Sequence, residues 1–131
     1  GYPDRIALRD AEPGEPLLLL NHLHQPADTP FRASHAIYVR EGEVHRHDAI
    51  DVVPDVLRRR VMSWRAFDAR HWLVDAGIVD GRSLESAIER AFATTGAAYL
   101  HLHYAGPGCY AARVDRVRPA CHGPPVTPTL P

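Results

Sequence analysis

The stretch that decides the fold is Tyr99-Leu100-His101-Leu102-His103-Tyr104. Successive side chains of a β-strand point to opposite faces of a sheet. A strand over residues 99–104 therefore places Leu100 and Leu102 on one face and His101 and His103 on the other. The pattern predicts a sheet that has two imidazoles side by side on one surface.

The same kind of periodicity predicts the remaining elements. Further strands are expected over residues 17–22, 35–40, 61–67, 72–79 and 111–117, with residues 1–16 as an exposed turn. The four leucines of 17–20 do not alternate with polar residues, which is typical of a strand buried on both faces. One helix should begin at Pro54, because proline is favoured at the first helical position. A second should begin after Ser83, a good N-cap residue, because apolar residues recur at helical spacing over 84–92.

These elements predict an α+β fold with a mainly antiparallel sheet of about six strands and two helices on one side. The length of 131 residues suits one domain, which we expect to span residues 1–118. Residues 119–131 are rich in proline and have little to bury, so they are expected to form a flexible tail.

Composition excludes several classes of function. The 15 basic and 16 acidic residues give a net charge of −1, which is not the footprint of a nucleic-acid-binding protein. Apolar runs such as 17–20 are far too short to span a bilayer. The two cysteines, Cys109 and Cys121, are too few for a disulfide framework, and we interpret both as thiols of a cytoplasmic protein. A small-molecule ligand is the expected partner, and a homodimer is left open.

The nine histidines carry most of the candidate chemistry. His101 and His103 suit either a metal site or a pair of groups that transfer protons. The alternative without a functional role is that both are half-buried histidines hydrogen-bonded to their neighbours. His22 and His24 have the same spacing, and four imidazoles could converge if the two strands were neighbours. Otherwise His22 and His24 would be solvated residues at the edge of a loop.

Three further residues lie where a strand meets a loop or turn. His35 opens a strand after a long loop, and it is either functional or bonded to the loop backbone. Cys109 follows Gly106-Pro107-Gly108, a turn that would let a ligand approach closely. It is either a nucleophile activated by a histidine or a small buried apolar residue. Arg113 could hold a carboxylate or phosphate, or it could form an ion pair with Asp115 or Glu41.

Several segments together resemble the bacterial DUF1203 family, whose function is unknown. They are residues 10–15, 18–37, 65–68, 99–103 and 107–113. The resemblance implies that His24, His35, His101, His103 and Cys109 belong to the family pattern, whereas His22 stands where tyrosine is usual. Tyr104 stands where asparagine is usual, which implies an altered substrate pocket.

The functional prediction is a small-molecule enzyme that uses histidine acid/base chemistry without a cofactor. Its predicted catalytic residues are His24, His35, His101, His103 and Cys109. Its predicted substrate-binding residues are Arg32, Arg113 and Tyr104. One alternative is a metalloprotein that binds zinc or iron through His24, His35, His101 and His103. The other is a non-catalytic binding or interaction module, in which the histidines only stiffen a polar pocket.

Overall fold

The computed structural model describes residues 3–42 and 52–116, which form two four-stranded sheets, two α-helices and one 3-10 turn. The α+β class is confirmed. The single sheet of about six strands is corrected to eight strands in two sheets, within the described part of the chain. Two of these strands, β1 (Pro3–Asp4) and β2 (Arg9–Asp10), are only two residues long. They are too short to produce an alternating pattern in the sequence.

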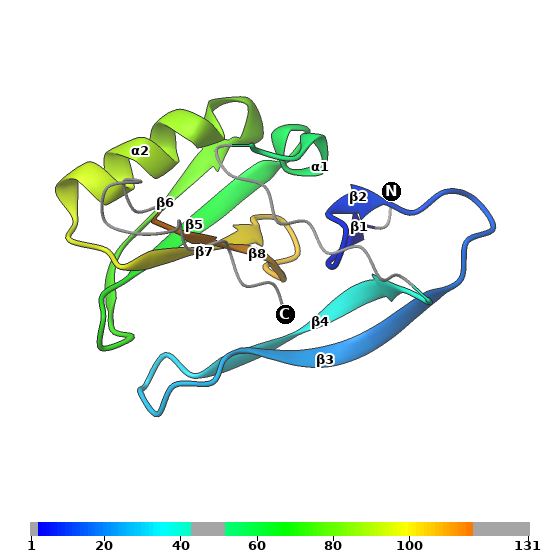
Figure 1. Ribbon diagram of the computed structural model, residues 1–131, viewed down its shortest axis with the longest axis horizontal. Coiled ribbons are helices and arrows are strands. Elements are labelled where there is room, and N and C mark those ends of the chain that lie inside the picture. The colour runs from blue at the N-terminus through cyan, green and yellow to red at the C-terminus, as the bar shows by residue number, and fades with distance from the viewer. Residues whose placement is uncertain (1–2, 43–51, 117–131) are drawn as a thin grey trace, which may run out of the picture.

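The helix-backed sheet has the strand order β6-β5-β7-β8 and is antiparallel throughout. Its strands are β5 (Val61–Phe67), β6 (Leu73–Asp80), β7 (Tyr99–Tyr104) and β8 (Tyr110–Asp115). The helix α2 (Leu84–Thr94) lies over one face, with the short α1 (Asp55–Arg58) beside it (Figure 1). A 3-10 turn, η1 (Gly81–Ser83), leads into α2; the Asp80 side chain caps that turn, while Ser83 makes no side-chain cap hydrogen bond.

The apolar core lies between the helix-backed sheet and its helices. Leu100 and Leu102 are fully buried there, as the alternation in residues 99–104 predicts. Leu100 packs in a small cluster with Ala91 of α2, and Leu102 packs in the larger cluster with Leu84. The histidine-bearing face of β7 is therefore the face that points away from the helices.

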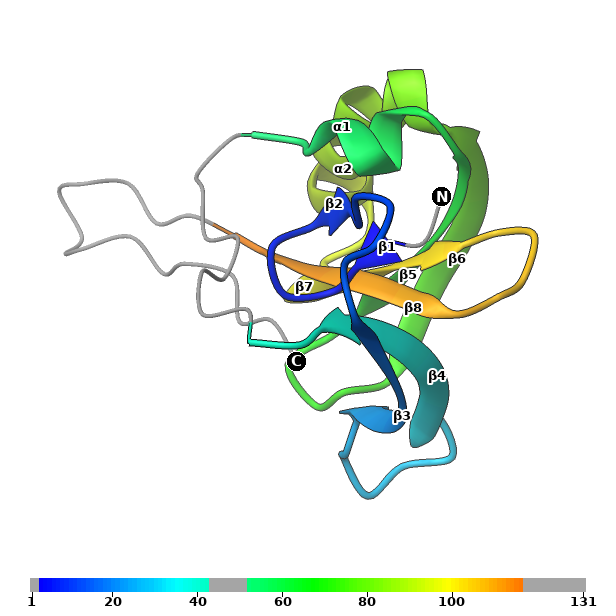
Figure 2. The ribbon, with the colours of Figure 1, turned by 90° about the vertical axis from the view of Figure 1, so that its right-hand side faces the viewer.

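The hairpin sheet has the strand order β2-β1-β4-β3 and lies on the opposite side of the helix-backed sheet from α2 (Figures 1 and 2). Its long strands, β3 (Leu17–Gln25) and β4 (Ala33–Arg40), pair in antiparallel fashion. Strand β3 is exposed along most of its length: Leu18, Leu19 and Leu20 keep 48%, 62% and 39% of their surface accessible. The prediction of a strand buried on both faces is therefore wrong, because only the end of β3 that carries His24 and Gln25 is buried against the helix-backed sheet.

The N-terminal segment connects the two sheets, which corrects the prediction that residues 1–16 form an exposed turn. Asp4 and Arg5 are almost completely buried. The Asp4 carboxylate accepts a hydrogen bond from the backbone N–H of Arg40 in β4, at 3.2 Å. The Arg5 guanidinium donates to the Tyr110 carbonyl in β8, at 2.8 Å, and to the Cys109 sulfur, at 3.0 Å. Arg5 and Asp4 thus hold the hairpin sheet against the helix-backed sheet.

Some sequence predictions concern residues outside the described ones. They include the proline-rich tail 119–131 with Cys121, and most of the polar segment between β4 and α1. Within residues 3–42 and 52–116, no helix is long and apolar enough to cross a bilayer.

Candidate metal centre

Strand β7 places His101 and His103 on the face that looks toward the hairpin sheet. Both side chains are buried, with 2% and 0% of their surface exposed. The antiparallel register sets Arg65 of β5 and Arg113 of β8 on either side of His101. Paired residues of an antiparallel sheet point to the same face, so both arginines share the surface that carries the histidines.

The hairpin contributes His24 and His35 from the other side. Strand β3 has a bulge, because three residue steps from His22 to Gln25 oppose two steps on β4. A bulge re-aims the side chains near it, and here His24 and Gln25 are both buried although they are consecutive. The Gln25 amide donates to the Tyr99 hydroxyl at 2.9 Å, which fixes this end of the hairpin on β7.

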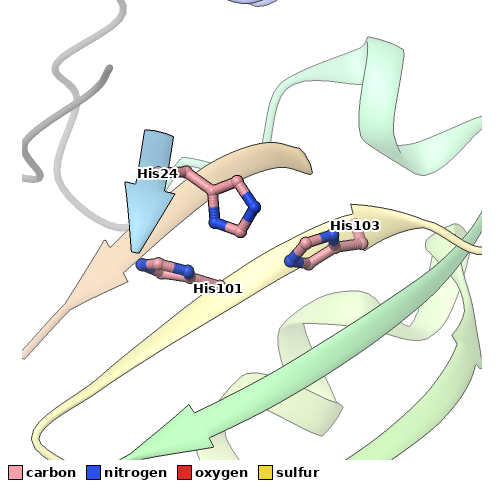
Figure 3. A group of neighbouring side chains, drawn as sticks. All are labelled: His24, His101 and His103. Carbon is pink, nitrogen blue, oxygen red and sulfur yellow. The ribbon is translucent and has the colours of Figure 1, made fainter. Parts of the chain in front are cut away.

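The three-histidine group, which we define as His24, His101 and His103, brings together three ring nitrogens, all within 4.8 Å of one another (Figure 3). Each ring has a buried nitrogen without a hydrogen-bond partner in the described structure: Nδ1 of His24, Nδ1 of His101 and Nε2 of His103. Buried polar atoms are paired in most proteins, so three unpaired nitrogens in one place are unusual.

Outer contacts define which nitrogen of a ring carries its proton. Nδ1 of His103 lies 3.0 Å from the carbonyl oxygen of Gly108, which can only accept. Nδ1 must therefore carry the proton, and Nε2 has the free lone pair. Nε2 of His24 lies 2.6 Å from Nδ1 of His35. If His24 donates in that contact, its Nδ1 also offers a lone pair to the centre of the group, and His35 serves as the outer partner.

The three imidazoles are neutral at physiological pH. Burial is the largest cause that lowers the pKa of His24 to about 3, of His101 to about 2 and of His103 to about 4. Neighbouring positive charges, including that of Arg65, lower these pKa values further. A neutral imidazole is the form that coordinates a metal ion.

Aromatic rings and one arginine form the wall around the group. Tyr110 stacks on His24, with ring centroids 4.7 Å apart and an interplanar angle of 10°. The hydroxyl of Tyr99 contacts His71 Nδ1 at 2.7 Å. The Arg113 guanidinium lies 4.0 Å above the Tyr99 ring and donates to the Asp115 carboxylate at 2.9 Å. Tyr99 in turn lies against His101, with ring centroids 5.4 Å apart.

Of the predicted catalytic residues, the structure brings together His24, His35, His101 and His103. Cys109 packs with the apolar core and accepts a hydrogen bond from Arg5. Of the predicted substrate-binding residues, Arg113 lies beside His101 but is paired with Asp115. Arg32 is exposed and donates to a carbonyl of its own loop, and Tyr104 is buried in the core on the helix side.

Two residues of the site, Arg65 and Tyr110, are absent from the residues that the sequence pattern singled out. Arg65 reaches the site only through its register opposite His101, and Tyr110 only through packing against the hairpin. Neither relation is visible in local periodicity. The sequence does point to both residues in one way, because each lies in a segment that carries the family resemblance.

Comparison with known proteins gives one match. The family described as Protein of unknown function (DUF1203) matches residues 1–116. No curated protein and no solved structure matches the chain. Since the match covers most of its length, this chain belongs to the DUF1203 family.

Proposed function

We propose that this protein binds a divalent transition-metal ion through His24, His101 and His103 and presents it to a small-molecule ligand. Two observations carry the proposal: His24, His101 and His103 each bring one ring nitrogen within 4.8 Å of the others, and each of the three rings has a buried nitrogen without a hydrogen-bond partner among the described residues. A buried polar atom without a partner costs about 1–3 kcal/mol. A metal ion at the centre would satisfy all three atoms at once.

The geometry is compatible with coordination after a small closure. Ligand nitrogens lie about 2.0–2.1 Å from zinc, so two nitrogens of a tetrahedral site are about 3.3–3.4 Å apart. The ring nitrogens of the three-histidine group lie within 4.8 Å of one another, so side-chain movements that shorten the widest separation by at most about 1.5 Å would reach that spacing. The contact of His103 with the Gly108 carbonyl is an outer hydrogen bond of the kind that metal-ligating histidines usually make, and His35 would be the outer partner of His24.

The ligand set favours an ion that remains open to a further ligand. Imidazole nitrogens suit zinc, iron, copper and nickel. Three protein ligands leave a coordination position for water or a bound molecule, which is typical of catalytic rather than structural sites. An ion held in this way would lower the pKa of a bound water and would polarise a bound oxygen atom.

Acid/base catalysis by the histidines alone has less support. An efficient general base has a pKa near the pH at which it works. The pKa values of about 2 to 4 in the three-histidine group make these imidazoles weak bases at neutral pH. His35 has a lowered pKa as well, because of its burial and the charge of Arg65.

The test is metal analysis of untagged protein, followed by titration of the metal-free protein with Zn²⁺ and Co²⁺. We expect one equivalent of metal, and a loss of affinity of about 100-fold or more in His24→Ala, His101→Ala and His103→Ala, since removal of an outer partner alone costs 10–100-fold. Circular dichroism of each metal-free variant checks that it folds.

The matched control is His22→Ala. His22 is in the same strand as His24, and the two ring centroids are 6.4 Å apart, but His22 is not part of the three-histidine group. Its removal should leave the affinity unchanged. The metal centre is excluded if the wild-type protein takes up no stoichiometric metal, or if His22→Ala weakens binding as much as the other three substitutions.

A further inference from the structure

Arg65 is a half-buried cation on the surface that carries the three-histidine group. It lies opposite His101 in the β5–β7 register. Its positive charge is one of the causes that lower the pKa of His24, His35, His101 and His103. Burial lowers the pKa of Arg65 as well. A guanidinium that is drawn out of water in this way normally has an anionic partner.

No such partner is present for Arg65 among residues 3–42 and 52–116. The other buried or half-buried arginines of this part of the chain all have hydrogen-bond or ion-pair partners: Arg5, Arg9, Arg40, Arg58, Arg60 and Arg113. Arg113 is the closest comparison, since it borders His101 on the other side and is neutralised by Asp115. Within the described part of the chain, no acceptor occupies the donors of the Arg65 guanidinium.

The charges around the group are unbalanced. Asp115, which lies opposite Tyr99 in the β7–β8 register, is already paired with Arg113. Among residues 3–42 and 52–116, Arg65 has no such carboxylate partner. Three neutral imidazoles, a divalent ion and the guanidinium would together carry a charge of +3. A buried charge of this size requires a counter-ion. Because the described residues supply no counter-ion here, we assign that role to the ligand.

We propose that Arg65 binds an oxyanion, a carboxylate or a phosphate group, of the small molecule that occupies the open position of the metal ion. The inference rests on the proposed metal centre. The planar guanidinium presents two parallel N–H groups to such an anion, which a lysine cannot do. One oxygen atom of the ligand would thus bind the metal ion, and its carboxylate or phosphate group would bind the Arg65 guanidinium.

The experiment uses Co²⁺-loaded full-length protein, whose visible absorption reports on the ligands of the ion. Acetate and inorganic phosphate are the two anionic probes, and acetamide is the neutral counterpart of acetate. We expect at least one anion to change the spectrum in a saturable manner and acetamide to have no effect. Comparison of acetate with phosphate identifies which group the site prefers.

Three variants test the role of Arg65. In Arg65→Gln, the anion should bind at least about tenfold more weakly, the usual range for a lost hydrogen bond to a charged group. Its affinity for Co²⁺ should be unchanged or higher, because a like charge has been removed; a merely structural role predicts a loss. Arg65→Lys should be intermediate. Arg70→Gln, which removes an exposed arginine from the β5–β6 turn, is the matched control and should match the wild type.

The outcomes separate this inference from the metal centre itself. If the wild type takes up Co²⁺ but no anion perturbs it, or if Arg65→Gln binds the anion as tightly as the wild type does, Arg65 is not an anion anchor and the metal centre stands. If the wild type takes up no Co²⁺ at all, both proposals fall.

Discussion

The helix-backed sheet and the hairpin sheet differ in what holds each of them in place. The helix-backed sheet buries Met62, Leu100 and Leu102 against its helices. The hairpin strand β3 fully buries only His24 and Gln25 and exposes four of its five leucines. Apolar burial therefore stabilises the helix-backed sheet, whereas the hairpin sheet is attached through hydrogen bonds of Arg5 and Gln25 together with the buried Ile37 and the ring contact of Phe31 with Trp72. The proposed metal centre lies where the two meet, with two ligands on the apolar-cored sheet and one on the hairpin.

The largest effect should come from the core of the helix-backed sheet. Leu102→Ala removes a fully buried side chain and leaves a cavity, so it should lower the free energy of unfolding by about 2–5 kcal/mol. Urea unfolding followed by circular dichroism measures this. An effect below about 1 kcal/mol would mean that the core is not concentrated on this side.

Metal binding should stabilise the junction between the sheets. At a metal concentration 100 times the dissociation constant, the free energy of unfolding should rise by about 2.7 kcal/mol. Thermal unfolding with and without Zn²⁺ measures the gain. His24→Ala removes the hairpin's ligand and should abolish the gain, whereas His22→Ala should keep it. A gain that persists in His24→Ala would show that the metal does not join the two sheets.

In metal-free protein, acid should weaken the fold through the histidines. The folded-state pKa of His103 is about 4, below its ordinary value of 6.5. Between these values the unfolded chain binds more protons than the folded chain, so stability is complete above about pH 6.5 and falls as the pH falls toward 4. His103→Gln removes one titrating group. The slope of the free energy of unfolding against pH should therefore fall by up to about 1.4 kcal/mol per pH unit. Urea unfolding from pH 7 to 4.5 measures the slope, and an unchanged slope would contradict the burial of His103.

The smallest effect is expected on the exposed side of the hairpin. Leu19 keeps 62% of its surface accessible, so Leu19→Ala should change the free energy of unfolding by no more than about 0.5 kcal/mol. This variant and Leu102→Ala remove the same atoms from the two sheets, and the same urea titration compares them. Equal losses would remove the distinction between the sheets.

Local pattern predicted the helix-backed sheet well and the hairpin sheet less well. The bounds of β5 and β7 and the shared face of His101 and His103 follow from alternation, because these strands have one apolar face and one polar face. Alternation could not show that β3 stacks across β7 from another sheet, or that a bulge turns His24 inward. The run of leucines at 17–20 was misleading, since hydrophobic residues at a sheet edge do not have to be buried.

The contact between Arg5 and Tyr110 has a consequence for the order in which the protein can assemble during synthesis. It joins residues 105 positions apart, and the hydrogen bond from Gln25 to Tyr99 spans 74. A ribosome releases the N-terminal segment and the hairpin long before the strands that they dock on. Contacts so distant in sequence form slowly. The histidines can therefore meet only after nearly the whole domain has emerged, and a nascent chain that stops before β7 should have no centre to load.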